Sequence, residues 1–96
     1  MRITFLEIAA LELEEAVHFY NKELPGLGEL FLKEVLRCLE RIAKYPDSCP
    51  FCSPRTQRCL TRRFPYGIIY QVRGEEILVV AVANLHRKPD YWRDRL

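Results

Sequence analysis

The chain contains no apolar run that approaches the roughly 18 residues of a membrane-spanning helix. Its first residues, Met1–Glu7, lack the apolar core and the small-residue cleavage site of a secretion signal. Internal repeats and low-complexity segments are also absent. We therefore expect a cytoplasmic protein that does not bind a membrane. We also expect one domain over residues 1–96, because this length supports one hydrophobic core and not two.

The net charge is small, at +2, but it is unevenly distributed along the chain. Residues 1–54 contain six basic and nine acidic residues, a net charge of −3. Residues 55–96 contain nine basic and four acidic residues, a net charge of +5, and eight of the nine are arginines. Guanidinium groups suit phosphate and carboxylate recognition, so this half predicts a surface for an anionic partner. The alternative is a set of solvated charges on one face of a sheet.

Four cysteines raise the question of a metal site: Cys38, Cys49, Cys52 and Cys59. The pair Cys49 and Cys52 has the two-residue gap of a zinc knuckle, but the chain has no second pair of this kind. Cys38 falls on the apolar side of an expected helix, where a thiol packs as a small hydrophobic group. A Cys49–Cys52 disulfide remains an alternative, although a reducing cytosol disfavours it. We expect four free thiols, with no metal and no cofactor.

The hydrophobic pattern predicts an α+β fold. An N-terminal strand at 3–6 precedes two amphipathic helices, at 9–24 and 27–45, and Pro25–Gly28 folds the helices into an antiparallel hairpin. A three-stranded antiparallel meander completes the chain. Its three strands are expected at 58–64, 66–72 and 77–83. An irregular connection at 46–57 precedes the meander, and a helical turn at 90–95 follows it. We expect the two helices to pack on one face of this sheet.

Four glutamates lie at or near the start of the first helix: Glu7, Glu12, Glu14 and Glu15. The helix dipole favours negative charge at this end. Apolar residues such as Leu13 and Val17 define the buried side of the helix, so the opposite side is expected to be acidic and solvated.

The strand Ile77–Ala83 points to the candidate functional site. Its seven consecutive apolar residues predict an interior strand with both faces covered. It runs directly into a polar segment that contains His86, Arg87 and Tyr91. A rigid element that ends in reactive side chains is a common way to position a site. His86 has the alternative role of capping the strand end, and for Trp92 we expect packing against the core.

In this order and at these spacings, several short motifs resemble the RelE/ParE superfamily of bacterial type II toxins, which includes plasmid stabilisation proteins. The motifs are Pro25-Gly26-Leu27-Gly28 with Phe31-Leu32, Pro46, Arg63-Phe64-Pro65-Tyr66, Ile69-Tyr70, His86-Arg87-Lys88-Pro89, Tyr91-Trp92 and Arg93. The resemblance covers nearly the whole chain. It implies a small toxin that a cognate antitoxin neutralises. RelE-like members cleave mRNA on the ribosome, whereas ParE-like members poison DNA gyrase.

The two branches need different chemistry from the same residues. A ribonuclease would use His86 as general acid or base, with Arg87 and Arg63 (or its neighbour Arg62) holding the phosphate and Tyr91 stacking on a base. A protein that only binds its target would present a surface, for which the candidates are Arg58, Arg62, Arg63, Arg87 and Tyr91. Both alternatives require the arginines and His86 to gather on one exposed surface.

The chain departs from the RelE pattern at Gly67. RelE-like nucleases resemble it at Tyr66 and then carry an arginine, and a glycine cannot supply that cation. The segment Val82–His86 is closer to the ParE branch. We therefore favour a ParE-type toxin that poisons gyrase. The alternatives are a ribosome-dependent mRNA endoribonuclease and a degenerate family member that is not toxic.

The antitoxin is expected to be an acidic segment that folds on binding. Such a segment would cover either the arginine-rich side of the sheet or the helical hairpin. Phe64 and Tyr66 flank Pro65, so we expect one ring to pack inward and the other to point outward, toward a partner.

Overall fold

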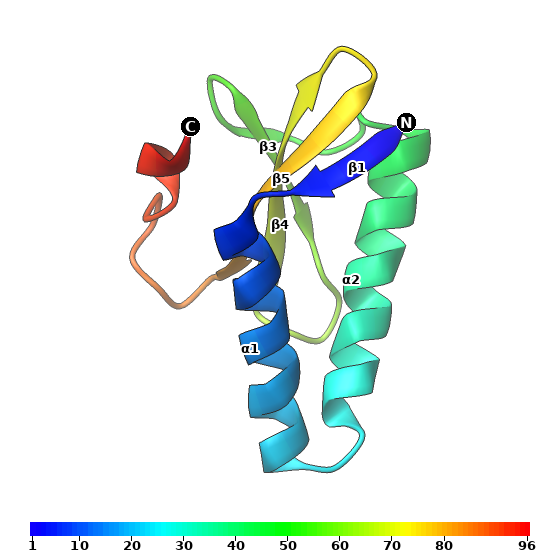
Figure 1. Ribbon diagram of the computed structural model, residues 1–96, viewed down its shortest axis with the longest axis vertical. Helices are drawn as coiled ribbons and strands as arrows, with labels where there is room; N and C mark the ends of the chain where they lie inside the picture. The colour runs from blue at the N-terminus through cyan, green and yellow to red at the C-terminus, as the bar shows by residue number, and fades with distance from the viewer.

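The two helices form the predicted antiparallel hairpin. The computed structural model describes all residues, Met1–Leu96, and its helices are α1 (Glu7–Glu23) and α2 (Leu27–Lys44) (Figure 1). The Asn21 side chain accepts hydrogen bonds from the backbone N–H groups of Gly26 and Gly28, at 3.2 and 2.8 Å. At Gly28 an added Cβ would lie 2.4 Å from the carbonyl oxygen of Val17. Only a glycine therefore permits the close approach of α2 to α1.

The sheet has five strands, in the order β1-β5-β4-β3-β2. Their bounds are β1 (Arg2–Phe5), β2 (Phe51–Ser53), β3 (Thr56–Leu60), β4 (Tyr66–Arg73) and β5 (Glu76–Asn84). β1 pairs with β5 in parallel, and all other pairs are antiparallel. The α+β class, the N-terminal strand and the interior position of β5 are thus confirmed.

The region before the meander differs from the prediction. The expected irregular connection at 46–57 contains the edge strand β2, so the antiparallel part of the sheet has four strands and not three. β3 ends at Leu60 and not at residue 64, because the chain turns at Arg62–Pro65. Arg63 adopts a φ of 69° in this turn. At the C-terminus only Arg93–Arg95 forms a helical turn, within the predicted 90–95.

Each face of the sheet has its own apolar cluster. The helices cover one face, where Phe31, Val35 and Ile42 of α2 pack with Ile68 and Val79 of the sheet. The opposite face carries a smaller cluster: Ile69, Val80, Ala81, Ala83 and Trp92. In Figure 1 the C-terminal segment passes the sheet on the side away from α2. The prediction that Trp92 anchors this segment on the core is confirmed, since only 4% of its surface is exposed.

Phe64 and Tyr66 both pack inward, so the expectation that one of them points outward is wrong. A tight turn at Pro65 is closed by a hydrogen bond of 2.8 Å from the Tyr66 N–H to the Phe64 carbonyl oxygen. Both rings contact Phe31, with centroids 5.2 and 4.8 Å away. Tyr20 of α1 completes this aromatic cluster.

The cysteines are free thiols, and Cys38 is buried on the apolar side of α2 as predicted. Neither helix combines the length and the apolar character needed to cross a membrane.

Candidate functional site

One edge of β5 is completed by side chains and not by a strand. β1 pairs with β5 only as far as Val79, and Leu6 donates the last backbone–backbone hydrogen bond of this edge to the Val79 carbonyl, at 3.0 Å. Farther along β5, the Val82 N–H donates to Oε1 of Glu12 at 3.0 Å. The Val80 carbonyl accepts from Nη1 of Arg95, also at 3.0 Å. Because unpaired buried backbone groups are costly, Glu12 and Arg95 take the place of the missing strand.

The Glu12 carboxylate joins α1, β5 and the C-terminal segment. Arg95 donates two hydrogen bonds to it, at 2.8 and 2.9 Å, in a bidentate pair. The Tyr91 hydroxyl donates to Oε2 at 2.7 Å, and Nη1 of Arg87 lies 3.7 Å from the same oxygen. The side chains of Glu12 and Arg95 are each only 13% exposed. Glu12 is therefore an exception to the expectation that the glutamates of this helix are solvated.

Sequence reasoning missed Glu12, although its position carried a signal. Glu12 follows the fully buried Ala9 by three residues and precedes the buried Ala16 by four. Residues with this spacing lie on one side of a helix, so Glu12 belongs to the buried stripe.

The pKa values of Tyr91 and Arg95 are both shifted in the direction that keeps these two side chains protonated, as donors to Glu12. Burial, followed by the hydrogen bond to Glu12, raises the pKa of Tyr91, so its hydroxyl remains a donor at neutral pH. The hydrogen bond to Glu12 is also the main reason that the pKa of Arg95 is raised, with burial acting in the opposite direction. Tyr91 and Arg95 therefore both keep, at neutral pH, the protons that they donate to Glu12.

A basic cavity of about 190 Å³ lies on the sheet face opposite the helices. Arg58, Arg87 and Lys88 are among its lining residues, together with Tyr91. The Arg87 guanidinium carbon lies 3.8 Å from the centroid of the Tyr91 ring, a stacked cation–π arrangement. Half of Arg87 still remains accessible, with 56% of its side chain exposed.

Gly67 has a structural role on this same face. A Cβ at position 67 would lie 3.0 Å from Cγ of Arg58, so the aliphatic part of Arg58 packs directly over the glycine. An arginine at position 67 would occupy that space. The glycine thus allows Arg58, from the neighbouring strand β3, to place its cation at the cavity.

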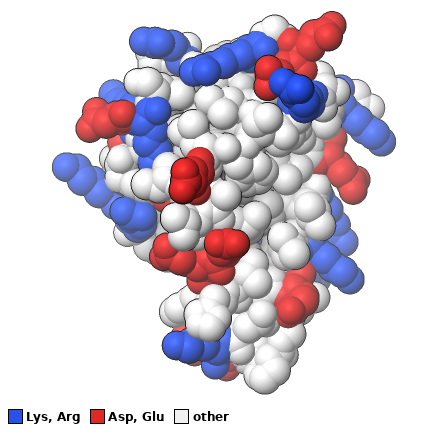
Figure 2. Space-filling view, viewed as in Figure 1, with Lys and Arg blue, Asp and Glu red and all other residues white.

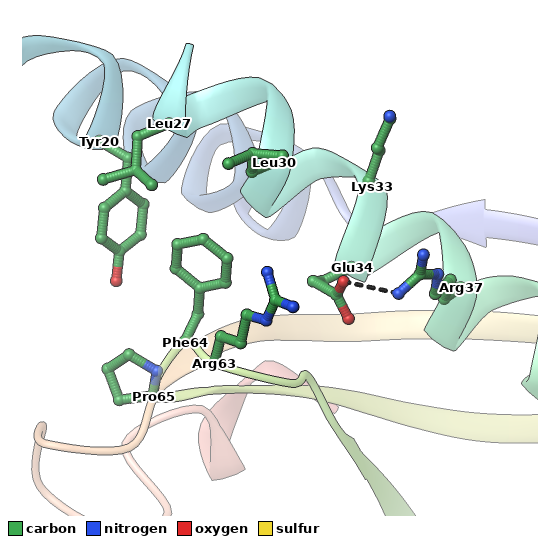
Figure 3. Close-up of a pocket in the computed structure, with 9 residues that line it drawn as sticks. All are labelled: Tyr20, Leu27, Leu30, Lys33, Glu34, Arg37, Arg63, Phe64 and Pro65. Carbon is green, nitrogen blue, oxygen red and sulfur yellow. Dashed lines mark hydrogen bonds and ion pairs between the residues drawn. The ribbon is translucent and has the colours of Figure 1, made fainter. Parts of the chain in front are cut away.

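A second and larger cavity, of about 520 Å³, lies between α2 and the turn at 62–65 (Figure 3). Its apolar lining comes from Tyr20, Leu27, Leu30, Phe64 and Pro65, and its charged lining from Lys33, Glu34, Arg37 and Arg63. Arg37 pairs with the largely buried Glu34 at 2.9 Å. Arg63 lies between Phe64 and Glu34 in Figure 3. The cavity combines an apolar floor with a mainly cationic rim.

A family model described as "ParE toxin of type II toxin-antitoxin system, parDE" matches residues 3–91. The chain belongs to the ParE toxin family. A solved structure described as the chromosomal ParDE TA system from P. aeruginosa has a similar fold, with a TM-score of 0.77 and 16% sequence identity. The match covers 90% of this chain and 97% of that chain. No curated protein sequence matches.

The predicted site residues of this ParE-family chain fall into two groups. Arg58, Arg87 and Tyr91 lie around the smaller cavity, on the sheet face opposite the helices. Arg63 lines the larger cavity at α2, and Arg62 lines a neighbouring cavity that includes Arg37 and Arg41. The expectation that all of these residues share one surface is therefore not met.

His86 is exposed in the turn that follows β5, near the turn that carries Arg63. The Leu85 N–H donates to the Pro65 carbonyl at 2.8 Å, which joins the two turns. The His86 backbone N–H is bonded to the Asn84 side chain, but its imidazole has no hydrogen bond or ion pair within the chain. His86, Arg87 and Arg63 thus do not converge on one cavity. On the face seen in Figure 2, basic side chains lie around the edge of the view, and acidic side chains lie both at the edge and among uncharged atoms near the middle.

Replacing Glu12 tests its role in the fold. Glu12→Ala leaves the Val82 N–H without its partner and the largely buried Arg95 without its carboxylate, so we expect a loss of about 3 kcal/mol in the free energy of unfolding, the lower end of the range for a broken buried charge pair. Urea denaturation of the purified chain measures it. Glu14→Ala, at an exposed position of the same helix, is the matched control and should change stability by less than about 0.5 kcal/mol. Equal effects of the two variants would contradict this role.

Proposed function

We propose that this ParE-family chain is a toxin that poisons DNA gyrase by binding to it, and that a cognate antitoxin neutralises it. The family supports a toxin of a type II toxin–antitoxin system, and the resemblance to ParE-like members indicates gyrase as the target. The observation that carries the proposal over catalysis is the pairing of Arg87. Its guanidinium stacks on Tyr91 and faces the Glu12 carboxylate at 3.7 Å, so its charge is already partly neutralised.

Cleavage of RNA would need a different arrangement. A phosphorane intermediate requires several cationic donors that converge on one point, with an acid and a base on either side. Arg63 and Arg87 line separate cavities, and the His86 imidazole has no group to orient it. A surface of stacked and paired side chains, in contrast, is well suited to recognising a protein.

One observation favours the nuclease as the second candidate. Arg58, Arg87 and Lys88 line a single small cavity with one acidic residue, Asp90, and this excess of positive charge can attract a phosphate group.

The larger cavity at α2 is the proposed contact for the antitoxin. Leu30 at its edge is 49% exposed, and Lys33, Arg37 and Arg63 surround an apolar floor. An amphipathic segment with acidic side chains would match both the floor and the rim. Covering this groove would also remove exposed apolar surface from water.

Induction of the chain alone in bacteria tests the target. We expect arrested growth with a DNA damage response and with intact mRNA. His86→Ala should remain as toxic as the wild type, because binding does not need a proton-transfer group, and His18→Ala on the exposed side of α1 is the matched control. Normal growth of the wild type would refute the proposal. Rapid mRNA cleavage that His86→Ala abolishes, and His18→Ala does not, would establish the nuclease instead.

Charge reversal at the rim tests the antitoxin contact. Lys33→Glu should weaken binding of the protein encoded by the adjacent reading frame roughly tenfold, because it places a negative charge against an acidic segment. Lys44→Glu makes the same change at an exposed position near the end of α2, away from the cavity, and should bind as the wild type does. Isothermal titration calorimetry of the purified pair gives the affinities. Unchanged affinity for Lys33→Glu would place the antitoxin elsewhere.

A further inference from the structure

Two cysteine side chains meet across the interface between α2 and β3. Cys38 and Cys59 are only 5% and 2% exposed. The Cys38 sulfur lies 3.9 Å from the carbonyl oxygen of Cys59 and 3.4 Å from that of Leu60, so it contacts the backbone of β3. The Cys38 and Cys59 side chains line the same cavity, and each of the two thiols shifts the pKa of the other. Neither cysteine takes part in the sites described above.

Both thiols line a cavity of about 380 Å³ with a cationic rim. Arg37, Arg41 and Arg62 contribute this rim, and Glu34 is the one acidic residue of the lining. A small polar oxidant can thus approach the two sulfur atoms through the cavity. Positive charge near a cysteine favours the thiolate, which is its reactive form.

The two thiols differ in their affinity for a proton. The hydrogen bond from Cys59 lowers the pKa of Cys38, and Arg41 acts in the same direction, although burial and the neighbouring Cys49 and Glu34 oppose it. The pKa of Cys59 is raised, first by this same hydrogen bond and then by burial. Cys38 is therefore the better nucleophile, while Cys59 keeps its proton.

We propose that Cys38 and Cys59 form a peroxide-sensitive thiol pair, which oxidation converts into a disulfide that links α2 to β3. The Cys38 sulfur attacks one oxygen of hydrogen peroxide, the O–O bond breaks, and Cys38 becomes a sulfenic acid as one water leaves. The Cys59 sulfur then attacks the Cys38 sulfur. The S–S bond forms, the S–O bond breaks, and the hydroxyl leaves as a second water with the Cys59 proton. The two thiols lose two electrons, and the peroxide gains them.

The other two cysteines are less suited to this reaction. Cys52 is half-buried, contacts Thr56 and packs toward the cluster that contains Trp92. The Cys49 thiol also interacts with that of Cys59, but Cys49 is buried beside Ser48 and does not line the cavity, so an oxidant does not reach it there. An oxidant that enters the cavity therefore reaches Cys38 and Cys59 first.

Peptide mapping of the full reduced chain after treatment with hydrogen peroxide tests the proposal. Trypsin cuts after lysine and arginine, which places Cys38 in residues 38–41, Cys59 in 59–62, and both other cysteines in 45–55. We expect two of the four thiols to be lost, a cross-link between peptides 38–41 and 59–62, and full recovery of the thiols with dithiothreitol. Cys52→Ser should give the same cross-link, whereas Cys38→Ser should give none.

Several results would overturn the proposal: four intact thiols, a cross-link that includes peptide 45–55, or irreversible oxidation of Cys38 without a cross-link. The wild-type map decides among them even if Cys38→Ser fails to fold. Since the readout is a covalent bond and not growth arrest, it is independent of the proposed toxin function.

Discussion

The Glu12 carboxylate is the contact on which the arrangement of this chain depends. β1 must end at Phe5, because the chain turns there into α1, and this leaves the far part of the β5 edge without a strand partner. Glu12 accepts from the Val82 N–H, and Arg95 donates to the Val80 carbonyl and to Glu12 itself. Each buried charge therefore has partners that offset its desolvation. The same contacts fix the C-terminal segment against the sheet.

Local patterns in the sequence predict most of the elements but not the contacts between distant residues. Spacing predicts both helices, and the apolar run Ile77–Ala83 predicts the interior strand β5. The three residues of β2 lie between Pro50 and Pro54, which is too short and too interrupted for a strand pattern. Glu12 and Arg95 are 83 residues apart, and no local pattern pairs them. Both rings next to Pro65 turn inward because the tight turn between Phe64 and Tyr66, just before β4, interrupts the alternation of side chains that a continuous strand would impose.

The arginines of the second half of the chain do not add up to one basic surface. Arg87, Arg93 and Arg95 each face an acidic side chain, so part of the positive charge serves the fold. The arginines that we predicted to share one site lie in separate places. Arg58 and Arg87 line the cavity at the C-terminal segment, whereas Arg62 and Arg63 line cavities along α2. This division favours two separate binding surfaces, one for a target and one for an antitoxin, over a single catalytic centre. Gly67 supports the first surface by making room for Arg58.

Amide hydrogen exchange at Val82 tests the central claim most directly. Val82 lies beyond the end of β1, and the bond to Glu12 is what would protect its N–H. Residue-resolved exchange of the wild-type chain should show the Val82 amide exchanging as slowly as the amides paired between β4 and β5. Exchange at the rate of an exposed loop amide, with the β4–β5 amides still protected, would show that Glu12 does not hold this edge.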